Sequence, residues 1–377
     1  MDAVIEKIDQ FRFISQTHTT VRQLIICSKI LKIIGKKHLP LNFLQLNLVN
    51  WSKEMEANSP AYKKCRGKIT DGGKQTTSFK HYIKLLQALG LLVNVNSIVS
   101  LTRSASILLT YLPDKNDYAF RLTSGETLFY FYFIMREDAD VIISVLQELS
   151  GFNDNINQKD LLNELLSSSD GSFENRLVQK QNLSSGLVKS FVGEKVRKIS
   201  FEWRKKEVYA EHIFVPRFEW LNQLGVISIL SNAQTFYRLQ SSALDLINAI
   251  PVFKGTDFKD VNEDWFEQKF MYSYSLIQAG DIHYKFYSDR RPTDIDNAIG
   301  EGLFNAFNQL GAQASLRMPL LATELFVIFG LAIERNIIIE ISELYNILEN
   351  GFNYNSKVFL AKKSARLSES YITISHL

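Results

Sequence analysis

The stretch that decides the fold is SFKHYIKLLQALGLLVNVNSIVSLT, residues 78–102. Its first half is apolar at positions i, i+3, i+4 and i+7, the spacing of one helix face, with Phe79, Tyr82, Ile83 and Leu86. Gly90 then stands where a helix commonly ends. Two short β-prone runs follow, at 92–95 and 98–101, with an Asn-Ser turn between them. The stretch therefore predicts a helix that leads directly into a small β-hairpin.

The flanking segments add further helices. Residues 19–35 and 41–56 carry apolar side chains at helical spacing, and a helix at about 104–112 follows the hairpin. Three helices and then a hairpin, joined by the LGLLVN junction at 89–94, resemble the winged helix, a helix-turn-helix variant with a β wing. The resemblance covers about residues 19–112. It implies that the helix after Thr77 is a recognition helix, although winged helices also serve as protein-binding modules.

A second copy is predicted about 135 residues later, at 216–249. A helix expected to begin at Pro216 ends at Leu224-Gly225, and a strand pair and a closing helix with the same Ser-Ala pair follow. Near the C-terminus, helices at 294–310 and 320–335 precede two strands in the tail. A third winged helix in this region is therefore an open alternative. The segments 271–277 and 283–287 look strand-like.

These patterns predict a mainly α-helical protein with small β-hairpins, organised as tandem winged-helix units joined by helical segments. Few glycines and prolines, 18 and 7, agree with long helices. The expected divisions are a basic N-terminal winged-helix unit at 1–118, a helical connector at 119–182, a second winged-helix unit at 183–250, and a C-terminal helical region with a terminal hairpin at 251–377.

The net charge is unevenly distributed. The whole chain carries 43 Lys and Arg against 40 Asp and Glu. Residues 1–89 hold 15 of the basic and 6 of the acidic residues, a net charge of +9, and the remainder holds 28 and 34, a net charge of −6. Such asymmetry points to an anionic partner for the basic part.

The candidate DNA-binding residues cluster in this basic part. They are Lys63, Lys64, Arg66, Lys68, Lys74, Lys80, His81, Lys84 and Gln87. The last four lie on the helix face opposite the apolar stripe, where a recognition helix meets the major groove. Their chemistry suits phosphate contacts better than base reading, so duplex DNA held by its phosphate backbone is the expected partner. The alternative interpretation is a solvated helix face beside a flexible loop. A second basic run at 189–206 is diluted by acids, which favours a solvated face.

No catalytic or metal site is expected, and no cofactor. Gly67–Gln75 lacks the spacing of a phosphate loop, and His283, Lys285 and Asp289 are one residue short of a phosphodiesterase motif. Two cysteines and six scattered histidines do not match a zinc site, and helix capping explains Asp294 more simply than metal binding. One alternative is a metal-dependent nuclease built on Asp260, Glu267 and Lys269.

The expected function is that of a non-enzymatic DNA-binding and scaffold subunit of a larger intracellular complex. Tandem winged helices without a catalytic motif look like accessory subunits of prokaryotic DNA-transaction and phage-defence complexes, whose other subunits include an ATPase or a nuclease. A protein-binding module without nucleic acid is the other alternative. The N-terminus shows no signal peptide, and the longest apolar run, 325–333, is too short to span a bilayer. We therefore expect a cytoplasmic protein without membrane contact.

Overall fold

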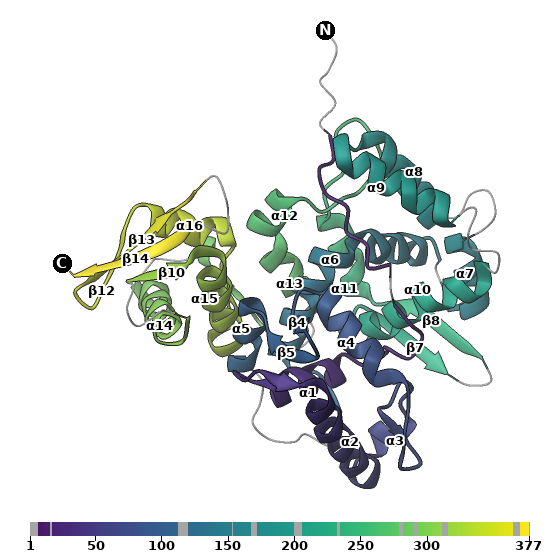
Figure 1. Ribbon diagram of the computed structural model, residues 1–377. Helices are drawn as coiled ribbons and strands as arrows, with labels where there is room; N and C mark the ends of the chain where they lie inside the picture. Colours follow the sequence, from purple (N-terminus) through teal and green to yellow (C-terminus); the bar gives the residue numbers. More distant parts are fainter. Residues whose placement is uncertain are drawn as a thin grey trace.

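The fold is mainly α-helical with small, mostly antiparallel sheets, as the sequence predicts. The computed structural model describes residues 7–15, 17–111, 120–152, 154–166, 172–199, 206–231, 234–278, 282–289, 293–310, 316–364 and 370–376. The long helix α6, Ser124–Ser150, runs through the middle of the molecule, and the C-terminal elements form a lobe beside α5, Arg103–Tyr111 (Figure 1). One hydrophobic core includes side chains from all parts of the chain.

The basic segment folds as the sequence predicts, apart from one loop. Its elements are α1 Leu24–Ile34, β1 Leu39–Pro40, α2 Leu41–Asn58, α3 Pro60–Lys64, β2 Thr70–Asp71, β3 Lys74–Gln75, α4 Ser78–Ala88, β4 Leu92–Val95 and β5 Ile98–Leu101. The predicted helix and hairpin are thus confirmed as α4, β4 and β5. The polar stretch 57–77 contains α3 and the hairpin β2–β3, so the segment Gly67–Gln75 is not the flexible loop that the sequence suggests.

The middle of the chain is built around α6. The following elements are β6 Ile156–Asn157, α7 Gln158–Leu166, α8 Ser172–Leu183, α9 Gly186–Arg197, α10 Lys206–Gln223, β7 Ile227–Ser231, β8 Thr235–Leu239 and α11 Ser241–Ala249. The prediction that a helix begins at Pro216 is wrong, because Pro216 lies inside α10. Proline cannot donate to the carbonyl four residues earlier, that of His212. The Thr17 hydroxyl donates to that carbonyl instead, at 2.7 Å, so the longer helix is tolerated.

The C-terminal part contains α12 Glu263–Gln268, α13 Phe270–Gln278, β9 Lys285–Phe286, the 3-10 helix Tyr287–Asp289, α14 Thr293–Leu310, β10 Arg317–Pro319, α15 Leu320–Arg335, β11 Ile337–Ile338, α16 Ile341–Glu349, β12 Phe352–Tyr354, β13 Lys357–Lys362 and β14 Tyr371–His376. The expectation of a strand at 271–277 is wrong, since this segment is α13. The backbone N–H groups of Met271 and Tyr272 donate to the Glu340 carboxylate, which satisfies the first turn of that helix.

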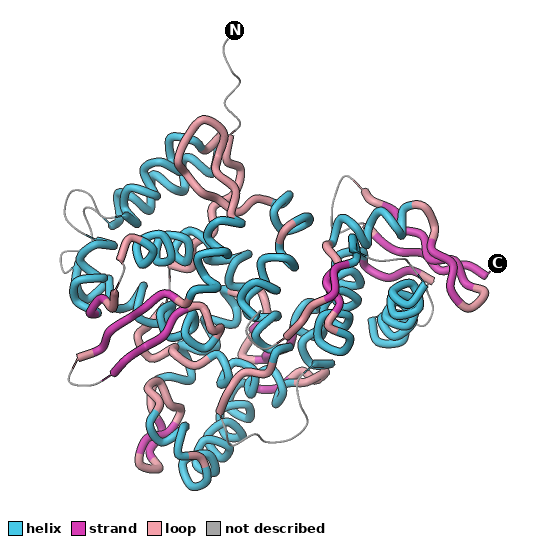
Figure 2. The backbone as a smooth tube through the Cα atoms, turned by 180° about the vertical axis from the view of Figure 1, so that it is seen from behind, coloured by secondary structure: helices cyan, strands magenta, loops and turns pink. Residues whose placement is uncertain are grey.

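The strands form small sheets that are scattered over the molecule (Figure 2), and the same order of three strands recurs in three of these sheets. In the orders β1-β5-β4, β6-β8-β7 and β10-β14-β13, a two- or three-residue strand before a helix pairs antiparallel with the last strand of a hairpin. The junction before the first two hairpins is also shared: the Leu91 amide donates to Leu86, and the Val226 amide donates to Leu221, both at 2.9 Å. The predicted LG junction therefore has one backbone geometry in both places.

Candidate nucleic-acid interface

The helix α4 presents its predicted polar face to solvent. Lys80, Lys84 and Gln87 are exposed and His81 is half-buried, while the apolar stripe of this helix is buried in the core. The Tyr82 hydroxyl fixes the helix: it accepts from the Gln23 amide and donates to the Gly67 carbonyl, both at 3.1 Å.

At Gly67, the loop before α4 lies very close to the backbone of Thr20. Gly67 has φ +78°, and a Cβ there would lie 2.1 Å from the Thr20 carbonyl oxygen. Only glycine fits this position, because it is the residue without a Cβ. The basic loop is therefore held against both α4 and the segment around Thr20.

The remaining predicted residues lie on α3, the loop and the β2–β3 hairpin. The side chains of Lys63, Lys64, Arg66 and Lys74 are exposed. Lys68 is half-buried and pairs with Asp71 at 2.7 Å, so its charge is partly neutralised. Arg66 lines a groove of about 660 Å³ whose other walls come from α7, α10 and β8.

Sequence reasoning missed two further members of this surface, His18 and His212. The rings of His18 and His81 stack with centroids 3.9 Å apart, and His212 of α10 lies 4.7 Å from His18. These three residues are far apart in the sequence and share no motif spacing, so only the fold brings them together. We call them the histidine cluster.

The surroundings of the histidine cluster are cationic. The pKa of His81 is lowered to about 4 by burial and by the positive charges of His18, Lys80, Lys84 and His212. Burial, His212 and Lys80 likewise lower the pKa of His18. Lys80 and Lys84 are the cations beside the cluster, and their positive charges would stabilise an anion bound here.

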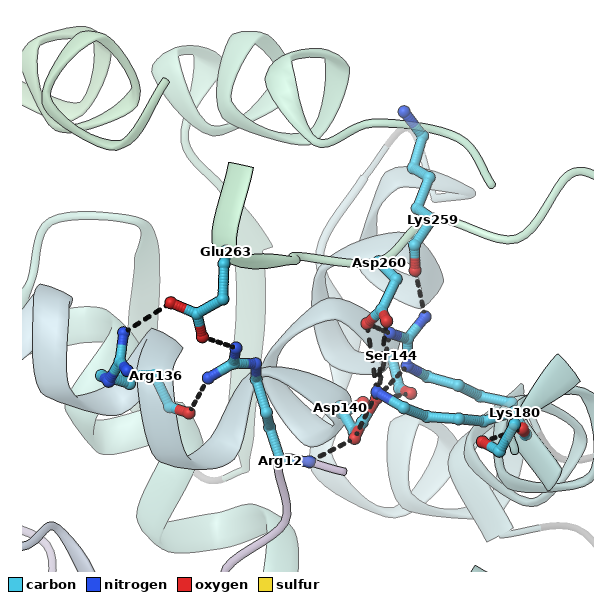
Figure 3. A network of polar contacts seen from close by, with 10 residues as sticks. Arg12, Arg136, Asp140, Ser144, Lys180, Lys259, Asp260 and Glu263 are labelled. Carbon is cyan, nitrogen blue, oxygen red and sulfur yellow. Dashed lines mark hydrogen bonds and ion pairs between the residues drawn. The ribbon is translucent and has the colours of Figure 1, made fainter. Parts of the chain in front are cut away.

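The residues of the nuclease alternative have separate partners. Asp260 is buried and pairs with Arg176 at 3.1 Å and Lys180 at 3.2 Å, beside Asp140 (Figure 3). Glu267 of α12 lies 3.7 Å from Lys363, and the Lys269 ammonium lies 5.9 Å from the Tyr272 ring centroid. In the parts of the chain that the structure describes, no group of three or more His, Cys, Asp or Glu side chains is placed to hold a metal ion.

The structure describes only part of the second basic run, residues 189–206. Lys189, Lys195 and Arg197 lie on α9, whereas residues 200–205 fall outside the described residues. Asp294, considered above as a possible metal ligand, lies in the first turn of α14.

The described helices include none that is both long and apolar enough to cross a membrane. No family model matches the chain, and no curated protein matches it in sequence.

Proposed function

We propose that the chain is a non-enzymatic DNA-binding and scaffold subunit of a larger complex, and that residues 19–112 act as a winged helix with α4 as the recognition helix. One observation carries the proposal: α4 exposes Lys80, Lys84 and Gln87 beside the half-buried His81, on a helix whose opposite face is fixed in the core. A rigid helix with exposed cations is suited to the DNA major groove.

The electrostatics of α4 favour an anionic ligand. Lys80 and Lys84 are like charges four residues apart, which destabilises a helix slightly. Phosphate groups would offset this repulsion and would release condensed counterions. The exposed cations Lys63, Lys64, Arg66 and Lys74 on the preceding segment would add phosphate contacts without sequence preference.

The second repeat lacks this chemistry. At the position of Lys84, α10 carries Glu219, which pairs with Arg22 at 3.2 Å. Arg217 is fully buried and pairs with Asp138 at 2.7 Å. We therefore assign DNA contact to the N-terminal repeat and a structural role to the second.

The scaffold role is supported by the outer face of the first small sheet. Val93, Val95 and Ile98 share this face and are 44%, 60% and 48% exposed. A wing with apolar side chains is better suited to a protein contact than to phosphate. Partner subunits such as an ATPase or a nuclease, in a cytoplasmic prokaryotic DNA-transaction or phage-defence complex, would fit this arrangement.

A DNA-binding titration against salt tests the proposal. The affinity of the full chain for a short duplex should fall steeply as salt rises, because each phosphate contact releases counterions. Replacing both lysines, Lys80→Ala with Lys84→Ala, should reduce the slope of log K against log salt by about two. The affinity loss should be similar for unrelated duplex sequences, because phosphate contacts carry no sequence information.

The matched control removes two exposed lysines from the C-terminal part, Lys285→Ala with Lys362→Ala. This variant changes the net charge equally and should keep the wild-type slope. An equal loss in both variants, or no binding by the folded protein at about 50 mM salt, contradicts the proposal.

A further inference from the structure

Two rings of the histidine cluster accept hydrogen bonds from backbone amides. The Thr20 amide donates to Nδ1 of His18, and the Thr19 amide donates to Nδ1 of His212, both at 3.3 Å. An imidazole nitrogen can accept only when it carries no proton. Nδ1 of His18 therefore carries no proton when it accepts from the Thr20 amide, and the Thr20 Oγ1 atom lies 3.0 Å from the same nitrogen.

The cluster lies where two helices and a connecting segment meet. His81 belongs to α4, His212 to α10, and His18 to the segment that passes between them. Thr17 anchors that segment through its 2.7 Å hydrogen bond to the His212 carbonyl. The three rings are thus part of a fixed surface next to the exposed Lys80 and Lys84.

We propose that the histidine cluster is a proton-linked phosphate-binding site, so that DNA binding at α4 takes up protons and strengthens as the pH falls. This inference rests on the proposed function, since it concerns the same surface. The ligand chemistry is a phosphodiester backbone, whose negative charge would stabilise imidazolium rings that the free protein disfavours.

The free protein disfavours protonation for a geometric reason. Two imidazolium rings stacked at 3.9 Å repel each other strongly, and Lys80 and Lys84 add to the repulsion. Lys80 and Lys84 act on His81 from its own helix. His18 acts on it from the connecting segment, and His212 acts on it from α10. All four lower the pKa of His81, in addition to burial.

The direction of the pH effect follows from linkage. In the free protein the pKa of His81 is about 4, so the ring is neutral near pH 7. A phosphate in contact with the cluster raises this pKa toward or above the ordinary histidine value of about 6.5. Between these two values the complex holds a proton that the free protein does not, and the affinity rises as the pH falls.

The test measures the affinity of the full chain for one DNA duplex between about pH 8 and about pH 5.5, at constant ionic strength. Histidine is the side chain that ordinarily titrates in this pH range. One linked proton should give roughly tenfold tighter binding at the acidic end. His81→Gln, which keeps a polar side chain without a titrating group, should lose most of this tenfold increase in affinity between about pH 8 and about pH 5.5, whatever its affinity at about pH 8. The control His283→Gln, at an exposed site in the C-terminal part, should keep it.

Calorimetry provides a second measurement that needs no variant. At about pH 6, the binding heat of the wild-type protein should depend on the ionisation enthalpy of the buffer, because protons are taken up from it. Salt-sensitive binding with no proton uptake, or an unchanged pH dependence in His81→Gln, overturns this inference and leaves the proposed function standing. Absence of binding at every pH overturns both.

Discussion

Two buried aspartates on α6, Asp138 and Asp140, hold the N-terminal segment and two helices in place. Asp138 has non-helical backbone angles, φ −137° and ψ 15°, at a kink in α6, and it accepts from the Ile14 amide and from Arg217. Asp140 accepts from the Arg12 amide at 2.8 Å and from Lys180 at 2.8 Å. The kink thus directs both carboxylates at charged partners that are distant in sequence.

Asp140 provides a prediction about stability. Burial alone would raise the pKa of Asp140, but Lys180 and Arg176 outweigh it and lower this pKa. Asp140→Asn leaves two buried cations facing Asp260 alone, so the free energy of unfolding should fall by about 3–5 kcal/mol. Urea denaturation at neutral pH measures this change, and the control Asp154→Asn, at an exposed turn, should alter it by less than about 0.5 kcal/mol.

The lowered pKa of Asp140 also determines how the destabilisation by Asp140→Asn depends on pH. A lowered carboxyl pKa stabilises the folded state above the unfolded value of about 3.9 and loses this contribution as the pH falls through the folded value. The gap between wild type and Asp140→Asn should therefore shrink in acid. A gap that stays constant down to about pH 3 would show that Asp140 is not the titrating group.

At the scale of single residues, the sequence could indicate which side chains are exposed but not which ones meet. The helical spacing places Lys80 and Lys84 opposite a buried stripe, as the structure has them. His18 and His212 carry no such signal, because their approach to His81 depends on the packing of α10 against the N-terminal segment. The ion pairs of Asp138 and Asp140 are equally invisible to local periodicity.

At the scale of elements, the junction between helix and hairpin is the most regular feature of the chain. Gly90 after α4 has φ +66°, Gly225 after α10 has φ +76°, and a Cβ on either would have no atom within 4 Å. Space is therefore not what requires glycine at these positions. The requirement is the left-handed backbone, which costs an ordinary side chain roughly 1–2 kcal/mol.

This geometry predicts a graded effect of substitution. Gly90→Ala should lower the free energy of unfolding by about 1 kcal/mol, because alanine is strained in the left-handed region. Gly90→Asn should cost less, since asparagine tolerates this region through local hydrogen bonds. Thermal unfolding of the two variants beside wild type measures the order. An equal loss in both would mean that side-chain bulk, and not the backbone angle, determines the effect.

The elements that sequence reasoning misassigned are those determined by distant contacts. The segment 271–277 is rich in β-prone residues, yet Glu340, far along the chain, caps its first turn and the core buries Met271, Tyr274 and Ile277. Pro216 looks like a helix start, yet Thr17 satisfies the carbonyl that it leaves free. In both cases tertiary contacts outweigh local preference.

At the scale of the whole molecule, α15 is one of the helices through which the C-terminal lobe contacts the rest of the chain, beside α16, which packs against α12. Helix α15 packs against α5 and α6 on one side and against α14, α16 and β14 of the lobe on the other (Figure 1). Glu324 of α15 is buried, and its Oε1 atom has no hydrogen-bond partner among the residues that the structure describes. Its charged neighbours are Glu267 of α12 and Lys363, which follows β13. A buried carboxyl group with one unpaired oxygen atom thus lies where these parts meet.

The position of Glu324 lowers the stability of the molecule as the pH rises from about 4.5 to about 8. Burial, with Glu267 adding to it and Lys363 opposing it, raises the pKa of Glu324 from 4.5 to about 8. The folded state therefore holds a proton that the unfolded state releases. The stabilising contribution is complete below the unfolded pKa and is lost as the pH rises through about 8, by up to about 1.4 kcal/mol per pH unit.

Glu324→Gln imitates the protonated carboxyl at every pH, so it isolates this effect. Relative to wild type, the variant should gain stability as the pH rises from about 5, and the gain should level off above about pH 8, as followed by urea unfolding at a series of pH values. Glu301→Gln, at an exposed site paired with Arg335, is the control and should show no such gain. A stability difference independent of pH would mean that Glu324 is ionised in the folded protein. The junction of α15 with α12 and Lys363 would then hold a buried charge without a hydrogen bond to Oε1, which burial makes costly.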